Sequence, residues 1–174
     1  MTNYFISMDK IINSERIIKV VRCDESCAEG AAALCAVCFN RDESAAHMAS
    51  FLSNKQTAAI CAKDGDTVVG YAAASVIADE AEIMDVAVSE NYRRRGIGRE
   101  LMSSLEALCG EMGASQIYLE VRSQNSAARA LYESLGYVAY GTRHGYYKNP
   151  ADDAVLMKKN LSSDTALADN SSSC

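Results

Sequence analysis

The alternation of hydrophobic and polar positions along the chain predicts interleaved strands and helices. Residues 116–122 (QIYLEVR) alternate apolar with polar side chains, which is the period of a strand with one buried face. From Ile97 to Met112, apolar residues recur every three or four positions, which is the spacing of one helix face. The same two patterns predict strands at 17–22, 57–62, 67–77, 82–88, 116–122, 137–141 and 154–158, and helices at 26–39, 44–52 and 97–112. A further helix should begin after Asn125 and be terminated by Gly136.

Glycines mark where several of these elements end. Asp64-Gly65 supplies the positive φ that a tight hairpin turn needs, so the strands on either side of it should pair. Gly113 and Gly136 stand where the two later helices should stop.

The two ends of the chain lack such patterns. Residues 1–15 show no clear period, and we leave them unassigned as an N-terminal extension. Residues 161–174 are rich in Ser with little to bury, so we expect a disordered tail. A chain of 174 residues suffices for one hydrophobic core but is short for two domains, so we expect a single domain at 16–160.

The charge balance argues against some classes of partner. The formal net charge is -6 and the pI is near 4.9, which is unfavourable for a protein that binds nucleic acid by neutralising its phosphates. No apolar run approaches the ~20 residues needed to cross a bilayer, and the first residues lack the pattern of a secretion signal. We therefore expect a cytoplasmic protein with no membrane or nucleic-acid partner.

Seven cysteines raise the question of a metal site or disulfides. The spacings of Cys23, Cys27, Cys35 and Cys38 look superficially like ligand pairs. However, the second pair lies in the apolar run AAALCAVCF, and nothing at zinc-finger spacing completes four ligands. An odd count of cysteines is ordinary in a reducing compartment. We expect free thiols, mostly buried, and no metal.

Residues 86–101 (VAVSENYRRRGIGREL) place three arginines and two glycines where a predicted strand meets a predicted helix. A helix N-terminus carries unpaired N–H groups and partial positive charge, and glycines let a phosphate approach the main chain. The pattern therefore predicts a phosphate-binding junction; the alternative is a basic run that is only a solvated helix start. The spacing excludes a Walker loop, and Leu101 replaces the third glycine of a dinucleotide fingerprint.

The order Arg93-Arg94-Arg95-Gly96-Ile97-Gly98 after a hydrophobic strand resembles the acetyl-CoA pyrophosphate loop of the GNAT superfamily. This resemblance implies an α/β (α+β) fold, with a central mixed, mostly antiparallel sheet of about seven strands flanked by about four helices. It also implies acetyl-CoA as the co-substrate. The implied acetyl-CoA-binding residues are Val86, Ala87, Val88, Arg93, Arg94, Arg95, Gly96, Ile97, Gly98, Arg99 and Asn125.

Two later segments resemble one group within that superfamily, the ribosomal-protein-alanine acetyltransferases. Residues 118–137 (YLEVRSQNSAARALYESLGY) are similar to its L-E-V-R-x-S-N-x-x-A-x-x-L-Y-x-x-L-G-F segment, and 143–154 (RHGYYKNPADDA) is similar to its R-x-x-Y-Y...D-A ending. The resemblance implies a base that deprotonates the incoming amine, an acid that protonates the leaving thiolate, and tyrosines that bind the substrate. These are Glu120, Tyr132, and the pair Tyr146 and Tyr147, respectively.

The residues alone leave each of these roles open. Strand alternation puts Glu120 on the more polar face, where a surface carboxylate would also lie. Tyr132 fits a half-buried packing aromatic, and Asn125 fits a helix N-cap. Tyr146 and Tyr147 fit ordinary strand aromatics.

The similarities together imply an N-acetyltransferase whose acceptor is a protein N-terminal α-amine, with the N-terminal alanine of a ribosomal protein as the expected substrate. Acetylation of a lysine or a small amine, and a non-catalytic acetyl-CoA-binding domain, remain alternatives. Relatives often carry Pro-Trp soon after Cys-Phe at the end of the first helix. Here Cys38-Phe39 is followed by 40–44 (NRDES), and the chain has no Trp, so the acceptor groove is expected to differ.

Overall fold

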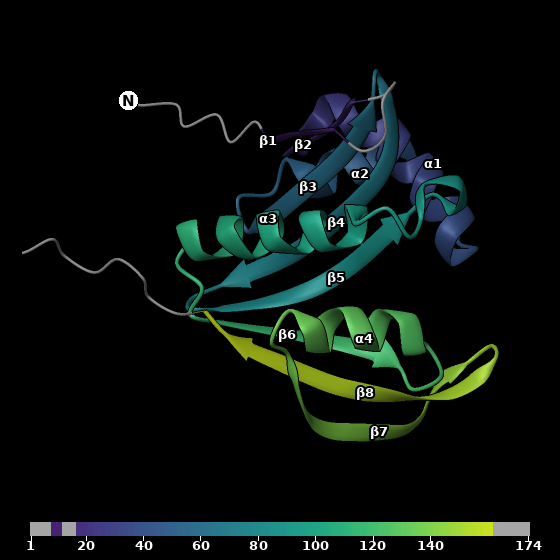
Figure 1. Ribbon diagram of the computed structural model, residues 1–174, viewed down its shortest axis with the longest axis vertical. Helices are drawn as coiled ribbons and strands as arrows, with labels where there is room; N and C mark the ends of the chain where they lie inside the picture. The colour runs from purple at the N-terminus through teal and green to yellow at the C-terminus, as the bar shows by residue number, and fades with distance from the viewer. Residues whose placement is uncertain (1–7, 12–16, 162–174) are drawn as a thin grey trace, which may run out of the picture.

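The computed structural model describes residues 8–11 and 17–161, which form a twisted sheet with helices on both faces (Figure 1). The eight strands lie in the order β1-β2-β3-β4-β5-β6-β8-β7. They are β1 Met8–Ile11, β2 Ile17–Arg22, β3 Thr57–Asp64, β4 Thr67–Ile77, β5 Glu80–Val88, β6 Gln116–Arg122, β7 Val138–Lys148 and β8 Ala151–Asn160. The helices are α1 Ala28–Phe39, α2 Ala45–Leu52, α3 Ile97–Glu111 and α4 Ser126–Ser134, with 3-10 turns at Glu25–Cys27 and Glu90–Tyr92.

Neighbouring strands of this sheet are antiparallel, except β5 and β6. Those two run parallel and are paired only from Glu80 to Glu82, opposite Gln116 to Tyr118. Beyond this short ladder the two strands separate, and Figure 1 shows them fanning apart from their shared end. The expected fold class, a mixed and mostly antiparallel sheet flanked by helices, is confirmed.

A bulge lies in β5 where it leaves β6. Ile83 lies opposite Ala74, but Asp85 lies opposite Ala73, so Met84 is an extra residue in the β4–β5 ladder. A β-bulge bends its strand and increases the local twist. The bulge therefore accounts for the separation of β5 from its parallel neighbour.

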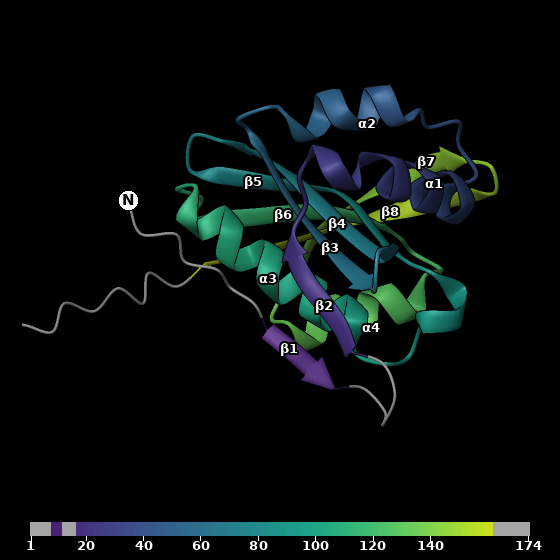
Figure 2. The same cartoon turned by 90° about the horizontal axis from the view of Figure 1, so that it is seen from above.

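Two hydrophobic clusters, one on each face of the sheet, hold the helices in place. Figure 2 shows α1 and α2 over one face and α3 and α4 over the other. We call the cluster that contains the buried residues of α1 the α1 cluster, and the one that contains those of α3 the α3 cluster. Successive residues of β4 alternate between them, with Tyr71 in the α1 cluster and Ala72 in the α3 cluster. A Cβ added at Gly70 would lie 2.9 Å from Leu101 Cδ1, so α3 approaches the sheet closely there.

The predicted elements agree with the structure in the middle of the chain and differ toward both ends. β1 lies inside the segment left unassigned and pairs antiparallel with β2. β7 and β8 are longer than predicted. The prediction relied on a hydrophobic period, and most side chains of β7 are exposed and show none. The extent of both strands is set by their backbone pairing with each other. Residues 1–7, 12–16 and the predicted tail from 162 onward lie outside the described residues.

None of the described helices is both long and apolar enough to cross a membrane.

Candidate functional site

The C-terminal half of β5 has one edge without a partner strand among the described residues. Its other edge is occupied, since Val86, Ala87 and Val88 lie opposite Ala72, Tyr71 and Gly70 of β4. Because β6 has already diverged, no described strand pairs with the β6 side of this segment. The Val88 carbonyl accepts from Arg93 Nε, and the remaining N–H and C=O groups on this side are available to an extended ligand. The predicted stretch 86–88 therefore forms one wall of the opening between the strands.

A basic loop leads from β5 to the N-terminus of α3. Arg94 (φ 63°) and Gly96 (φ 83°) both adopt the left-handed conformation, so the backbone turns sharply before the helix. The side chains of Arg93, Arg94 and Arg95 are exposed. Arg93 Nε donates to the last carbonyl of β5 at 3.0 Å, and the Arg95 guanidinium lies 5.3 Å from the Tyr92 ring centre. Three exposed cationic side chains thus come immediately before the first N–H groups of α3.

Gly98 lies where α3 meets α4 and the end of β5. A Cβ added there would lie 3.4 Å from Leu131 and 3.9 Å from Val88, so it would enter the space between the two helices and the strand. The next residue, Arg99, donates from Nη2 to Ser134 Oγ of α4 at 2.7 Å and so joins the two helices.

Ile97 is 2% exposed and belongs to the core, so only its backbone can face a ligand. Asn125 caps α4, its side-chain oxygen accepting the Ala128 N–H at 3.1 Å, as the N-cap interpretation predicted. Contacts of Ile97, Arg99 and Asn125 with acetyl-CoA stay predictions.

Glu120 extends from the face of β6 opposite the α3 cluster. Ile117, Leu119 and Val121 are buried in that cluster, as the alternation predicted. The Glu120 side chain is 21% exposed, and its Oε1 accepts a hydrogen bond from Arg143 Nη1 of β7 at 2.5 Å. Glu120 is therefore a paired, half-buried carboxylate rather than a freely solvated one.

Tyr132 comes from α4 and is buried in the α3 cluster, at 7% exposure. Its ring meets that of Tyr137 edge to face, with 5.8 Å between centroids. Burial, with a smaller contribution from the charge of Tyr147, raises the pKa of Tyr132 to about 12. The phenol is therefore neutral throughout the physiological pH range.

The two tyrosines of β7 that are predicted to bind substrate, Tyr146 and Tyr147, lie near the Glu120–Arg143 pair. The pKa of Tyr146 is raised, chiefly by hydrogen bonding to the Glu120 carboxylate. The pKa of Tyr147 is raised first by burial and then by the charge of Glu120. The two rings meet edge to face with centroids 5.1 Å apart, and the Arg143 guanidinium that pairs with Glu120 lies 5.6 Å from the Tyr146 ring centre. Glu120, Tyr146 and Tyr147 are therefore joined through Arg143. Tyr146 is 47% exposed and forms the solvent side of this group.

Three further residues support this group, and sequence reasoning gave them no role. Arg143 pairs with Glu120. The Arg122 guanidinium lies 4.1 Å from the Tyr147 ring centre and donates to two carbonyls of the β7–β8 turn. Asp152 accepts from the side-chain hydroxyl of Ser123 at 2.6 Å in the loop before α4. The sequence shows that these three side chains are charged, but the residues that they contact depend on how β6, β7 and β8 pair.

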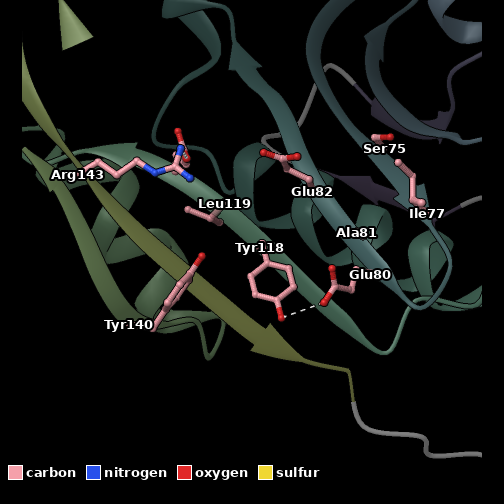
Figure 3. A pocket seen from close by; sticks show the side chains of 10 residues that line it. Ser75, Ile77, Glu80, Ala81, Glu82, Tyr118, Leu119, Tyr140 and Arg143 are labelled. Carbon is pink, nitrogen blue, oxygen red and sulfur yellow. Dashed lines mark hydrogen bonds and ion pairs between the residues drawn. The ribbon is translucent and has the colours of Figure 1, made fainter. Parts of the chain in front are cut away.

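A pocket of about 400 Å³ opens beside Glu120. Figure 3 shows other residues of its lining, among them Glu82, Tyr118 and Arg143. It is formed by residues of β4, β5, β6 and β7. Its polar lining consists of Ser75, Glu80, Glu82, Tyr118, Glu120, Tyr140 and Arg143. The predicted base thus lines a pocket large enough for part of a substrate.

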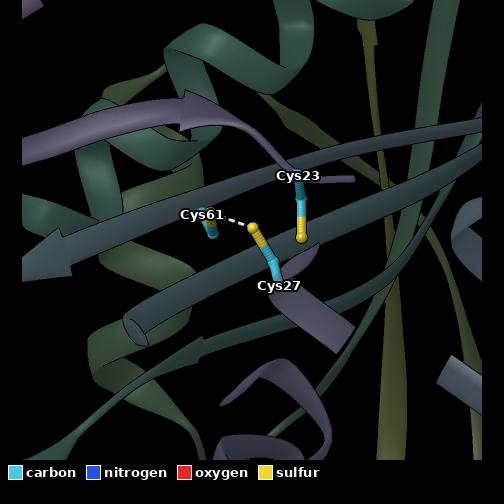
Figure 4. Close-up of side chains that lie close together, drawn as sticks. All are labelled: Cys23, Cys27 and Cys61. Atoms are coloured by element: carbon cyan, nitrogen blue, oxygen red, sulfur yellow. Dashed lines mark hydrogen bonds between the residues drawn. The ribbon is translucent and has the colours of Figure 1, made fainter. Parts of the chain in front are cut away.

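The structure also brings Cys61 of β3 next to Cys23 and Cys27 (Figure 4). The three Sγ atoms lie within 4.8 Å of one another, and those of Cys27 and Cys61 are 3.5 Å apart. The six described cysteines are free thiols, and all but Cys38 are buried. Within the described part of the chain this group has three members, whereas a closed zinc site takes four ligands. The absence of metal stays a prediction.

Comparison with known proteins gives a family match over most of the chain. The model of the acetyltransferase (GNAT) family matches residues 28–137. The chain is 38% identical over 92 residues to the [ribosomal protein bS18]-alanine N-acetyltransferase of Escherichia coli K12, covering 52% of the chain and 62% of that protein. It is also 38% identical over 112 residues to an uncharacterised protein of Mycobacterium leprae, covering 62% of the chain and 30% of that protein. These matches span less than two thirds of either relative.

Solved structures share the fold over a larger part of the chain. The crystal structure of the ribosomal-protein-S18-alanine N-acetyltransferase from Escherichia coli superimposes with a TM-score of 0.74 at 26% identity, covering 85% of this chain and 97% of that one. An acetyltransferase structure from Salmonella typhimurium, solved with its cofactor acetyl-CoA, gives a TM-score of 0.74 at 18% identity, covering 86% of this chain and 96% of that one. At 18% identity, the second likeness concerns the fold alone.

Proposed function

Because this chain belongs to the GNAT family of acetyltransferases, we propose that it transfers the acetyl group of acetyl-CoA to the N-terminal α-amine of a protein. We further propose the N-terminal alanine of a ribosomal protein as the acceptor, and the cytoplasm as the place of reaction. The observation that carries the proposal is that Glu120, joined through Arg143 to Tyr146 and Tyr147, lies on β6 just beyond the point where β6 separates from β5.

The residues around that opening fit acetyl-CoA. The backbone edge at 86–88, which pairs with no described strand on its β6 side, suits the amide groups of a pantetheine arm, and the start of α3 suits a pyrophosphate. Gly98 keeps the space between Leu131 and Val88 clear of a side chain. Arg93, Arg94 and Arg95 supply the positive charge, and the bound co-substrate supplies a thioester carbonyl as the electrophile.

Glu120 is the proposed base. A protein α-amine has a pKa near 8, so at pH 7 most of it is protonated and one proton must be removed before attack. The carboxylate reaches that proton directly or through one water, while Arg143 holds its Oε1 and fixes the side chain. A lysine acceptor has a pKa near 10.4, so a smaller fraction of it is neutral at pH 7 and the same base would remove its proton less readily.

Tyr132 is the proposed acid. It keeps its proton at neutral pH because burial raises its pKa to about 12, and it protonates the thiolate as the carbon–sulfur bond breaks. An isolated thiol has a pKa near 8.5, which would make this transfer uphill in water. Burial disfavours the thiolate as well as the tyrosinate, so it raises the pKa of the thiol too. The difference between the pKa values of the thiol and of Tyr132 is therefore smaller in the buried site than for a thiol in water.

The segment after α1, where relatives carry Pro-Trp, is held against β5 by an ion pair. Arg41 donates from both terminal nitrogens to Asp85 of β5, at 3.0 and 2.5 Å, and lies 3.2 Å from Glu43. The Arg41 guanidinium also lies 5.0 Å from the Phe39 ring centre. This bidentate pair fixes the segment after α1 against β5, so a polar contact takes the place of an aromatic one.

The proposal is tested by measuring thiol release from acetyl-CoA with three kinds of acceptor: peptides with a free N-terminal alanine, N-terminally blocked peptides containing lysine, and polyamines. Mass spectrometry of the product locates the acetyl group. We expect turnover on the α-amine of the first class. Turnover only with lysine or polyamines would overturn the acceptor class, and failure to bind acetyl-CoA in calorimetry would overturn the activity.

A further inference from the structure

The pocket beside Glu120 has a composition that the reaction itself does not require. The strand register places Ser75, Glu82 and Tyr118 opposite one another on β4, β5 and β6. Residues in register on neighbouring strands extend from the same face of a sheet, and Figure 3 shows the side chains of Glu82 and Tyr118 lining one pocket. Glu120 follows two positions after Tyr118, about 7 Å further along the same face.

Negative charge exceeds positive charge in the lining of this pocket. Glu80, Glu82 and Glu120 contribute carboxylates, and Arg143 is the one basic residue among the described lining residues. Arg143 is already paired with Glu120. The Tyr118 hydroxyl donates its one proton to Gln116 Oε1 at 2.7 Å, so its 3.4 Å contact with Glu80 leaves the charge of that carboxylate in place.

Glu82 is exposed, and its carboxylate makes no hydrogen bond or ion pair with any other described residue. The pocket therefore retains carboxylate charge that a cationic ligand would satisfy.

Aromatic rings form the other wall. Tyr118 and Tyr140 meet edge to face, with ring centroids 6.0 Å apart. Lys158 of β8, which lies opposite Tyr118, already contacts the Tyr140 ring, with its Nζ 5.6 Å from the centroid. The Tyr118 ring has no such cation contact with another described residue, so it is the aromatic ring open to a ligand. Aromatic faces combined with carboxylates attract ammonium and guanidinium groups more strongly than either feature does alone.

We propose that the pocket formed by Glu80, Glu82, Tyr118 and Tyr140 is a subsite for a cationic side chain of the acceptor, so that the enzyme prefers protein N-termini with Lys or Arg at the second or third residue. The inference rests on the proposed function, because the pocket faces the acceptor only if the amine reacts at Glu120. Consecutive Cα atoms are about 3.8 Å apart, so a chain whose amine lies at Glu120 brings these residues within side-chain reach of Glu82.

The test compares acetylation of peptides that share the N-terminal alanine and differ at residues two and three, which are Arg, Lys, Gln or Glu. Thiol release gives kcat/KM for each peptide with the wild type, Glu82→Gln, Glu82→Lys and the double variant Glu80→Gln/Glu82→Gln. Glu111→Gln is the matched control, because Glu111 is exposed at the end of α3 and does not line the pocket.

We expect the Arg and Lys peptides to exceed the Gln peptide by about three- to tenfold in kcat/KM, with the Glu peptide lower still. The preference should weaken with added salt, shrink in Glu82→Gln, disappear in the double variant, and reverse toward the Glu peptide in Glu82→Lys. Glu111→Gln should behave as the wild type.

The two proposals fail in different ways. If all alanine peptides are acetylated at equal rates by the wild type, the cationic subsite is wrong and the proposed function stands. The subsite is also wrong if the Arg preference persists undiminished in the double variant. If no α-amine is acetylated although acetyl-CoA binds, the proposed acceptor class is wrong, and the subsite proposal fails with it.

Discussion

Arg143 Nη1 on β7 donates to Glu120 Oε1 on β6 at 2.5 Å, across the strand β8 that separates their two strands in the sheet. The two residues are 23 positions apart in sequence, and their strands are neighbours of β8 rather than of each other. The contact fixes the carboxylate proposed to act as the base, and it also means that any substitution of Glu120 breaks an ion pair.

Glu120→Gln tests the base. The rate should fall most at low pH, where the α-amine is largely protonated, and should recover in part as the pH rises toward and beyond the amine pKa near 8. High pH removes the same proton without the carboxylate. The measurement is kcat/KM with an alanine peptide between pH 6 and 10.

Arg143→Met is the matched control, because it breaks the same ion pair and keeps the carboxylate. Its pH dependence should follow the wild type, with loss of a few-fold at most from a partly exposed pair. If both variants show the same low-pH loss, the pair rather than the base explains the effect.

Tyr132→Phe tests the acid. It should lower kcat by about 100- to 10,000-fold, the usual range for a positioned general acid, and high pH should not restore the rate. Acetyl-CoA affinity should change little, because Tyr132 is not assigned to the pyrophosphate. Near-normal kcat across the pH range would show that Tyr132 is only a packing residue of the α3 cluster.

The raised pKa of Tyr132 also predicts how stability depends on pH. The unfolded phenol ionises near pH 10, but the folded one keeps its proton until about pH 12, so the unfolded state binds fewer protons between these values. The stability contributed by this group is complete below pH 10 and is lost as pH rises to 12. Between pH 9 and 11.5, the wild type should lose about 2 kcal/mol more than Tyr132→Phe in free energy of unfolding. Denaturant titrations at pH 9 and 11.5 measure it; a constant difference between the two proteins would contradict the prediction.

Gly98→Asp tests the loop. The new side chain would bring a negative charge into the space between Leu131 and Val88, beside the predicted pyrophosphate site. Acetyl-CoA binding should be abolished while the fold is kept, as calorimetry and circular dichroism can measure. Gly98→Ala is the control, because its Cβ makes only ordinary contacts at 3.4 and 3.9 Å, and it should weaken binding less. Unchanged affinity in Gly98→Asp would remove the loop from the site.

The cysteines give a prediction on metal content. Cys23, Cys27 and Cys61 lie close enough to share an ion, but among the described residues they form a group of three. We expect the purified protein, kept reduced, to contain no stoichiometric metal and no structural disulfide. Native mass spectrometry measures both, and one zinc per chain that is lost in Cys61→Ser would overturn the prediction.

The sequence by itself determined the local features of this protein. The alternation of residues 116–122 is enough to assign Glu120 and Leu119 to opposite faces of β6, with Leu119 on the buried one. Gly113 and Gly136, both with positive φ, follow α3 and α4 as predicted. The basic loop was found because its chemistry and its position between strand and helix lie within a few consecutive residues. Features of this kind depend on neighbours along the chain, and the sequence lists those neighbours directly.

The tertiary structure decided everything that depends on which strands pair. The bulge at Met84 separates β5 from β6 and opens the site, yet no residue type marks it in the sequence. The order β6-β8-β7 brings Arg143 to Glu120, and packing of α1 on the sheet brings Cys61 to Cys27. β7 was predicted too short because its side chains are mostly exposed and only backbone hydrogen bonds define it. Contacts between distant residues follow from strand order and register, which a single sequence does not encode in any local period.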